Sequence, residues 1–146
     1  PGYGALEMVD GERAALAWAL RRREIFLART QEPPMGLDMR MLVTPINGAF
    51  DDLRDRPASM TEKERWAVGD ALYKQGSKGV IFTPTEHPRV RAITVFNAEV
   101  LGSSAQAAHY RFLWDGVAIS TIYDFSDGTE VTRDELLVES GARAAA

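Results

Sequence analysis

The chain has 146 residues, 45% of them hydrophobic, which is enough to bury an apolar core in a single domain. Its 17 Lys and Arg residues are outnumbered by 21 Asp and Glu residues, and the net charge of -4 argues against direct binding to nucleic acid or to a membrane surface. Cysteine is absent, which excludes disulfides and thiolate chemistry, and no apolar run approaches the roughly 20 residues that span a membrane. We therefore expect a cytoplasmic protein.

The first predicted element is a helix over residues 10–30. Asp10 can cap its start, and residues 14–20 are strong helix formers without Gly or Pro. Pro33 and Pro34 cannot continue a helix, so the chain is expected to leave it there.

A half-buried strand and a second helix are predicted next. Apolar and polar residues roughly alternate over residues 37–46, and Asn47-Gly48 makes a turn after them. A short extended piece at residues 50–53 precedes a helix at residues 62–75, which starts with the capping-box pair Thr61 and Glu64.

The second half of the chain is dominated by strands. An apolar run between Gly and Pro predicts a buried strand, and Asp115-Gly116 predicts a hairpin turn between the last two strands. The four strands are expected at residues 79–83, 91–96, 110–114 and 117–123. This order predicts an α+β fold with one mostly antiparallel sheet and packed helices, in a single small domain over residues 1–125. Residues 126–146 are expected to form a polar tail, with residues 141–146 as its disordered end.

The common catalytic motifs are missing. The two histidines, His87 and His109, have no ligand spacing, so no metal site is expected. The sequence contains no glycine-rich phosphate loop and no serine elbow.

A few polar and aromatic residues are open to two interpretations. Arg22, in a run of three arginines, can bind a phosphate or belong to a solvated helix face. Trp18 can stack on a ligand or pack in the core, and Tyr3 can line a pocket or belong to a flexible terminus. Thr83 and Thr85 follow a strand, where ligand contacts are common.

Several segments, in order and spacing, resemble the RES domain family over about residues 3–123. They are residues 3–7 (YGALE), 25–34 (IFLARTQEPP), 37–40 (LDMR), 51–54 (DDLR), 67–72 (AVGDAL), 76–82 (GSKGVIF), 87–88 (HP), 95–96 (VF) and 109–119 (HYRFLWDGVAI). The resemblance implies a fold similar to ADP-ribosyltransferases and an activity that consumes NAD by hydrolysis, phosphorolysis or ADP-ribosyl transfer. It also implies a bacterial toxin that is paired with a DNA-binding antitoxin. NAD is then a substrate rather than a cofactor, and a homo-oligomer is compatible with the sequence.

The chemistry of NAD cleavage explains the residue types that the resemblance assigns to the site. Breaking the nicotinamide–ribose bond develops positive charge on the sugar, which a carboxylate stabilises. An Arg holds the pyrophosphate with two parallel hydrogen bonds, a Tyr lines the pocket, and a hydroxyl binds a ribose or amide group.

Residue by residue, this sequence departs from the family pattern. The family's Arg precedes the segment that Tyr3 begins, so the N-terminal part of the family domain is expected to be absent. Trp18 stands where the family has its Glu, eight residues before the Phe26-Leu27 pair, and Pro84 stands where it has its Ser.

Two explanations follow from these departures. In the first, Glu7, Glu12 or Glu24 replaces the carboxylate and Thr83 or Thr85 replaces the hydroxyl. The catalytic residues are then expected to be Tyr3, Glu24 and Thr85, and the residues that bind NAD to be Trp18, Arg22 and Thr83. In the second, the domain has lost catalysis and binds a nucleotide or a protein.

Overall fold

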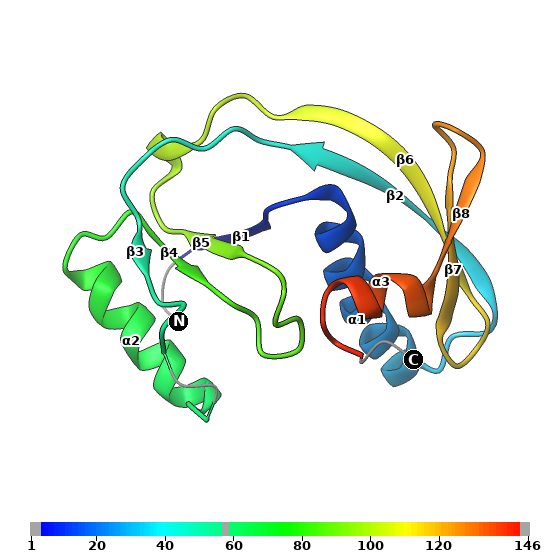
Figure 1. The fold of residues 1–146 in the computed structure, drawn as a ribbon, viewed down its shortest axis with the longest axis horizontal. Helices are drawn as coiled ribbons and strands as arrows, with labels where there is room; N and C mark the ends of the chain where they lie inside the picture. Colours follow the sequence, from blue (N-terminus) through cyan, green and yellow to red (C-terminus); the bar gives the residue numbers. More distant parts are fainter. Residues whose placement is uncertain (1–3, 57–58, 144–146) are drawn as a thin grey trace. The chain divides into compact units, whose positions relative to one another are not determined.

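The computed structural model describes residues 4–56 and 59–143. It has the predicted α+β fold, with helices α1 to α3 and strands β1 to β8 in two sheets (Figure 1). The chain divides into two compact units, each assembled from two stretches of chain. Unit 1 comprises Pro1–Asp10 and Thr44–Ser103, and unit 2 comprises Gly11–Val43 and Ser104–Ala146.

Unit 1 contains a four-stranded sheet in the order β1-β5-β4-β3. Strand β5 pairs antiparallel with β1 and with β4, whereas β3 pairs parallel with β4. The elements are β1 (Leu6–Val9), β3 (Asp51–Asp52), α2 (Glu62–Lys74), β4 (Gly79–Phe82), β5 (Ala92–Val95) and a 3-10 helix (Ala98–Val100).

Local sequence explains two features of this unit. Helix α2 starts with the predicted capping box, in which the Glu64 backbone N–H donates to the Thr61 hydroxyl at 3.2 Å and the Thr61 N–H donates to the Glu64 carboxylate at 2.6 Å. Gly79 opens β4 where a Cβ atom would come within 2.6 Å of the Thr94 carbonyl oxygen, so only glycine allows β4 and β5 to pair there.

Unit 2 contains an antiparallel sheet in the order β2-β6-β7-β8. Its elements are α1 (Glu12–Thr30), β2 (Met35–Val43), β6 (Ala105–Trp114), β7 (Ile119–Asp124), β8 (Thr129–Thr132) and α3 (Arg133–Glu139). The hairpin predicted at Asp115-Gly116 joins β6 to β7, and the Asp115 carboxylate accepts from the backbone N–H groups of Val117 and Ala118.

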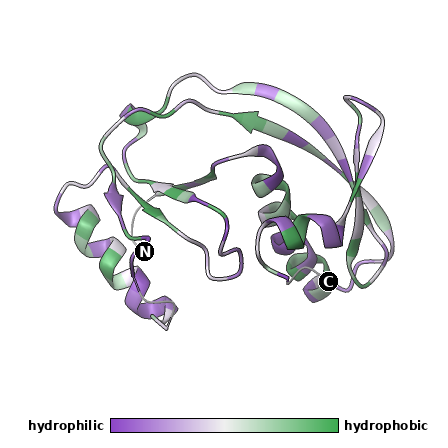
Figure 2. Ribbon diagram, viewed as in Figure 1, coloured by the Kyte–Doolittle hydropathy of each residue, from purple (hydrophilic) through white to green (hydrophobic). Residues whose placement is uncertain are grey.

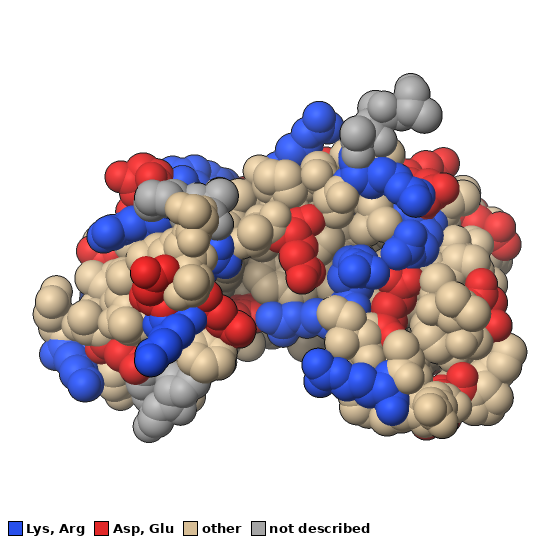
Figure 3. Space-filling model, turned by 90° about the horizontal axis from the view of Figure 1, so that it is seen from below, with Lys and Arg blue, Asp and Glu red and all other residues tan. Residues whose placement is uncertain are grey.

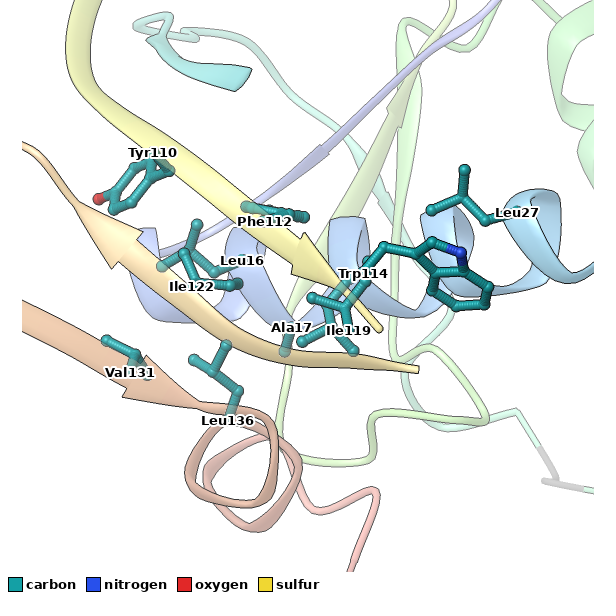
Figure 4. Close-up of a cluster of buried hydrophobic side chains, with 11 residues drawn as sticks. Leu16, Ala17, Leu27, Tyr110, Phe112, Trp114, Ile119, Ile122, Val131 and Leu136 are labelled. Carbon is teal, nitrogen blue, oxygen red and sulfur yellow. The ribbon is translucent and has the colours of Figure 1, made fainter. Parts of the chain in front are cut away.

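The core of unit 2 lies between α1 and the sheet. Alternate residues of β6, Tyr110, Phe112 and Trp114, point to the same side as Ile119 and Ile122 of β7 (Figure 4). Leu20 on α1 is fully buried, and the Trp114 indole N–H donates to the Glu32 carbonyl at 2.9 Å. The indole nitrogen of the buried Trp114 therefore has a hydrogen-bond partner, as buried polar groups usually do.

The structure differs from the sequence prediction in residues 126–146. Strand β8 and helix α3 lie there instead of a polar tail, and Val131 and Leu136 belong to the core of unit 2. The signal was present, because Thr132 and Glu135 form a second capping box. Of the expected disordered end, residues 144–146 lie outside the described residues.

Replacing Thr132 with Ala is expected to destabilise the protein by about 0.5–2 kcal/mol, because the Glu135 N–H would lose the hydroxyl that caps α3. Urea unfolding measures this loss. The control is Ser120→Ala on the exposed side of β7, which should stay within about 0.5 kcal/mol of the parent. Equal stability of the two variants would contradict a packed, capped α3.

Candidate functional site

A pocket of about 660 Å³ lies within unit 1, between its sheet and helix α2. Strand and loop residues form the sheet wall, which we define as Ala5, Glu7, Val80, Phe82, Thr83, Pro84, Thr85, Pro88, Thr94 and Phe96. The segment before α2 and the helix itself form the helix wall, which we define as Leu53, Arg54, Arg56, Met60, Glu62, Arg65, Trp66, Val68 and Gly69. Figure 1 shows α2 beside the strands of unit 1, and Figure 2 shows its hydrophobic middle between hydrophilic ends.

The sheet wall contains a carboxylate and three hydroxyls. Glu7 projects from β1, Thr94 from β5, and Thr83 and Thr85 from the loop that follows β4. Glu7 pairs in register with Thr94, which places the two residues on neighbouring strands. The structure thus brings together Thr83, Thr85 and Glu7, one of the three carboxylates considered from the sequence.

The helix wall contains the arginines Arg54, Arg56 and Arg65. The Arg54 guanidinium donates to both oxygens of Asp52, with N–O distances between 2.6 and 3.1 Å. This side-chain hydrogen bond, followed by one from the Arg54 backbone N–H, lowers the pKa of Asp52 to about 2. Asp52 is therefore ionised near neutral pH and engages Arg54.

Apolar side chains line the pocket between these polar groups. Leu53, Met60 and Val68 contribute from the helix wall, and Val80 and Phe96 contribute from the sheet wall. At the far end of α2, the Tyr73 ring packs edge-on against Phe96 at 5.7 Å. A mostly apolar pocket with a few polar groups is typical of sites that bind small molecules.

Glu24 lies in unit 2, on α1, where it is 5% exposed. Its carboxylate accepts from Arg133 at 2.8 Å, from Arg21 at 2.9 Å and from the Ile119 backbone N–H at 3.0 Å. Burial alone would raise the pKa of Glu24, but these hydrogen bonds together outweigh it and lower the pKa. Because its oxygens are already engaged in a buried ion pair, we assign Glu24 a structural role.

Three other residues considered from the sequence, Trp18, Arg22 and Glu12, do not line the unit 1 pocket. Trp18 and Arg22 lie on α1 in unit 2, where the Arg22 guanidinium stacks on the Trp18 ring at 4.9 Å. Glu12 accepts a hydrogen bond from the Tyr110 hydroxyl, also in unit 2. Tyr3 lies outside the described residues.

Sequence reasoning missed Trp66 and Arg56, both in the helix wall. Glu62, Trp66 and Gly69 follow the i, i+4, i+7 spacing of one helix face, so the sequence does contain this stripe. The sequence does not indicate whether this stripe faces a pocket or a core. That distinction depends on the position of the sheet in the folded unit.

Charge and ligand chemistry add three observations. Basic and acidic side chains are interspersed on the face drawn in Figure 3, without a continuous basic surface. Among residues 4–56 and 59–143, no group of His, Asp and Glu side chains is arranged to hold a metal ion. No helix in the part of the chain that the structure describes has the length and apolarity needed to cross a membrane.

Comparison with known proteins gives two matches. The family model for the RES domain matches residues 3–115. Uncharacterized protein y4oC of Sinorhizobium fredii (strain NBRC 101917 / NGR234) is 44% identical over 133 residues, which cover 91% of this chain and 57% of that protein. The chain thus spans little more than half the length of this relative. No solved structure matches the chain. The match over residues 3–115, together with the α+β fold, shows that the chain belongs to the RES domain family.

Proposed function

We propose that this RES domain acts on NAD and cleaves its nicotinamide–ribose bond in the unit 1 pocket. The observation that carries the proposal is the position of Glu7, Thr83 and Thr85 along one wall of that pocket. A carboxylate can stabilise the positive charge that develops on the ribose, and hydroxyls can bind a ribose or amide group. The expectation of NAD chemistry itself comes from the resemblance to the family.

Glu7 would act on the ribose of the nicotinamide half. As the bond between ribose C1′ and the nicotinamide nitrogen breaks, the electron pair leaves with nicotinamide and positive charge develops on the sugar. The Glu7 carboxylate would stabilise that charge, and an acceptor with a lone pair would then bond to C1′ and release any proton it carries to the solvent. Water, phosphate and a protein side chain are all acceptors that this chemistry allows.

The other two carboxylates considered from the sequence lie in unit 2, away from the unit 1 pocket lining. Glu24 is held by Arg133, Arg21 and the Ile119 N–H, and Glu12 by the Tyr110 hydroxyl. Both belong to unit 2, whereas Thr83 and Thr85 belong to unit 1. Glu7 is therefore the carboxylate that we carry into the proposed site, in place of Glu24.

A second candidate function is nucleotide binding without turnover. It is favoured by Pro84, which lies in the sheet wall between Thr83 and Thr85 and has no hydroxyl. In either case we propose an antitoxin protein as the partner, in keeping with the family's usual toxin-antitoxin pairing.

Incubation of the purified chain with NAD tests both candidates. Nicotinamide release above a buffer blank, measured by chromatography, supports cleavage. A rise in unfolding temperature with NAD but no release supports binding alone, because a ligand that binds only the folded state stabilises it. If NAD causes no nicotinamide release and no rise in unfolding temperature, the proposed function is rejected.

A further inference from the structure

Trp66 is a large aromatic side chain in the helix wall of the unit 1 pocket. It lies on α2 and is 55% exposed, although indole rings usually bury most of their surface. Within the part of the chain that the structure describes, its ring stacks on no other aromatic ring and on no cation. With more than half of its surface exposed in the pocket wall, the indole can offer surface to a planar ring that enters the pocket.

Arg56 lies in the same wall and differs from the other two arginines there. Arg54 is engaged by Asp52, and Arg65 has an interaction of its own. The backbone N–H of Arg56 donates to the Leu53 carbonyl, which fixes the turn before α2. Its guanidinium forms no ion pair with any side chain of residues 4–56 and 59–143.

The helix wall thus contains an aromatic side chain and a guanidinium that forms no ion pair among the described residues, and these two groups match the chemistry of a nucleoside phosphate. A base can stack on the indole, since every base has a π-face, and Arg56 can bind phosphate oxygens through two parallel N–H groups. The apolar side chains of Met60 and Val68 in the same wall would exclude water from the stacked base.

We propose that the helix wall is an adenosine-phosphate subsite, with Trp66 stacking on adenine and Arg56 contacting phosphate. This inference rests on the proposed function, because the reacting ribose is assigned to Glu7 on the sheet wall. The adenosine half of the dinucleotide is then expected to bind at the helix wall. Trp66 and Arg56 are accordingly positioning residues that set which nucleotide binds and in which direction.

Calorimetric binding of AMP, ADP-ribose and nicotinamide mononucleotide tests the subsite without any turnover. Trp66→Ala should weaken AMP and ADP-ribose about 5- to 150-fold and leave nicotinamide mononucleotide unchanged. Trp66→Phe should recover much of the loss, because its ring still stacks. Arg56→Gln should weaken ADP-ribose about tenfold or more and leave adenosine, which has no phosphate, unchanged.

The matched control is Lys63→Gln, which removes a positive charge from α2 outside the pocket lining and should change none of these affinities. If Trp66→Ala leaves AMP binding intact, or weakens nicotinamide mononucleotide instead, the assignment is overturned. The same holds if the unmodified chain binds neither AMP nor ADP-ribose. Binding of AMP that depends on Trp66, without nicotinamide release from NAD, would reject cleavage and retain the subsite.

Discussion

Replacing Glu7 with Gln is expected to lower the rate of nicotinamide release from NAD about 100- to 1000-fold. The amide keeps the size and hydrogen-bonding shape of the side chain but removes the negative charge that the developing oxocarbenium ion needs. Binding of NAD should change much less, because the charge acts mainly in the transition state. The measurement is steady-state kinetics, with kcat and KM determined separately.

Glu99→Gln is the matched control for this variant. It makes the same change at an exposed position of unit 1 that is not a lining residue of the pocket, so the parent rate should be kept. If Glu7→Gln also keeps the parent rate, Glu7 is not the catalytic carboxylate. Thermal unfolding of the same samples measures the folded fraction. A drop in rate that equals the drop in folded fraction would reflect unfolding rather than the loss of a catalytic carboxylate.

Replacing Glu24 with Ala is expected to destabilise the protein by about 3–5 kcal/mol. The change leaves the Arg133 guanidinium without its closest acidic partner and the Ile119 N–H without an acceptor, in a place where Glu24 is 5% exposed. Urea unfolding followed by circular dichroism measures the loss. For comparison, Glu139→Ala breaks an ion pair with Arg13 in which both side chains are about half exposed, and it should cost about 1 kcal/mol or less.

The same ion pair predicts a dependence of stability on pH. The folded pKa of Glu24 is lowered from its ordinary value of 4.5, so its contribution is complete above that pH and is lost as the pH falls through the folded pKa. Stability of the parent should therefore decrease below about pH 4.5 more steeply than that of Glu24→Gln. Parallel curves for the two proteins would contradict a stabilising, ionised Glu24.

Local sequence signals predicted most of the elements because their causes are local. The capping box at Thr61, the turn at Asp115-Gly116 and the alternation in residues 37–46 each depend on residues a few positions apart. The structure confirms a helix, a hairpin and a strand there. The capping box at Thr132 has the same spacing and is followed by the apolar residues 136–138, so the expectation of a polar tail there was wrong.

Strand β1 was missed because its pairing is not local, whereas the short extended piece predicted at residues 50–53 contains β3. Strand β1 becomes a strand by pairing with β5, where Leu6 lies opposite Val95, and β3 has only two residues, which pair with Val80 and Ile81. No periodicity develops over such short segments. The position of Glu7 depends on that pairing, so the sequence alone could name it only as one of three alternatives.

The candidate site was predicted in part, and for the same reason. The position of Thr83 and Thr85 after a strand was enough to suggest a ligand wall, and both line the unit 1 pocket. The structural role of Glu24 depends on Arg133, which is 109 positions away in the sequence. Side-chain type alone cannot separate a catalytic carboxylate from one that neutralises a distant arginine.

The chain passes between units 1 and 2 three times, after Asp10, after Val43 and after Ser103. During synthesis, α1 therefore leaves the ribosome long before β6, β7 and α3, which complete the core of unit 2. Until these elements have emerged, the apolar residues of α1 have no core to pack into. Unit 1 can close once residue 103 has emerged, whereas unit 2 needs almost the whole chain. Truncation from the C-terminus should consequently expose α1 to aggregation or to capture by chaperones, and neither unit can be produced as one uninterrupted fragment.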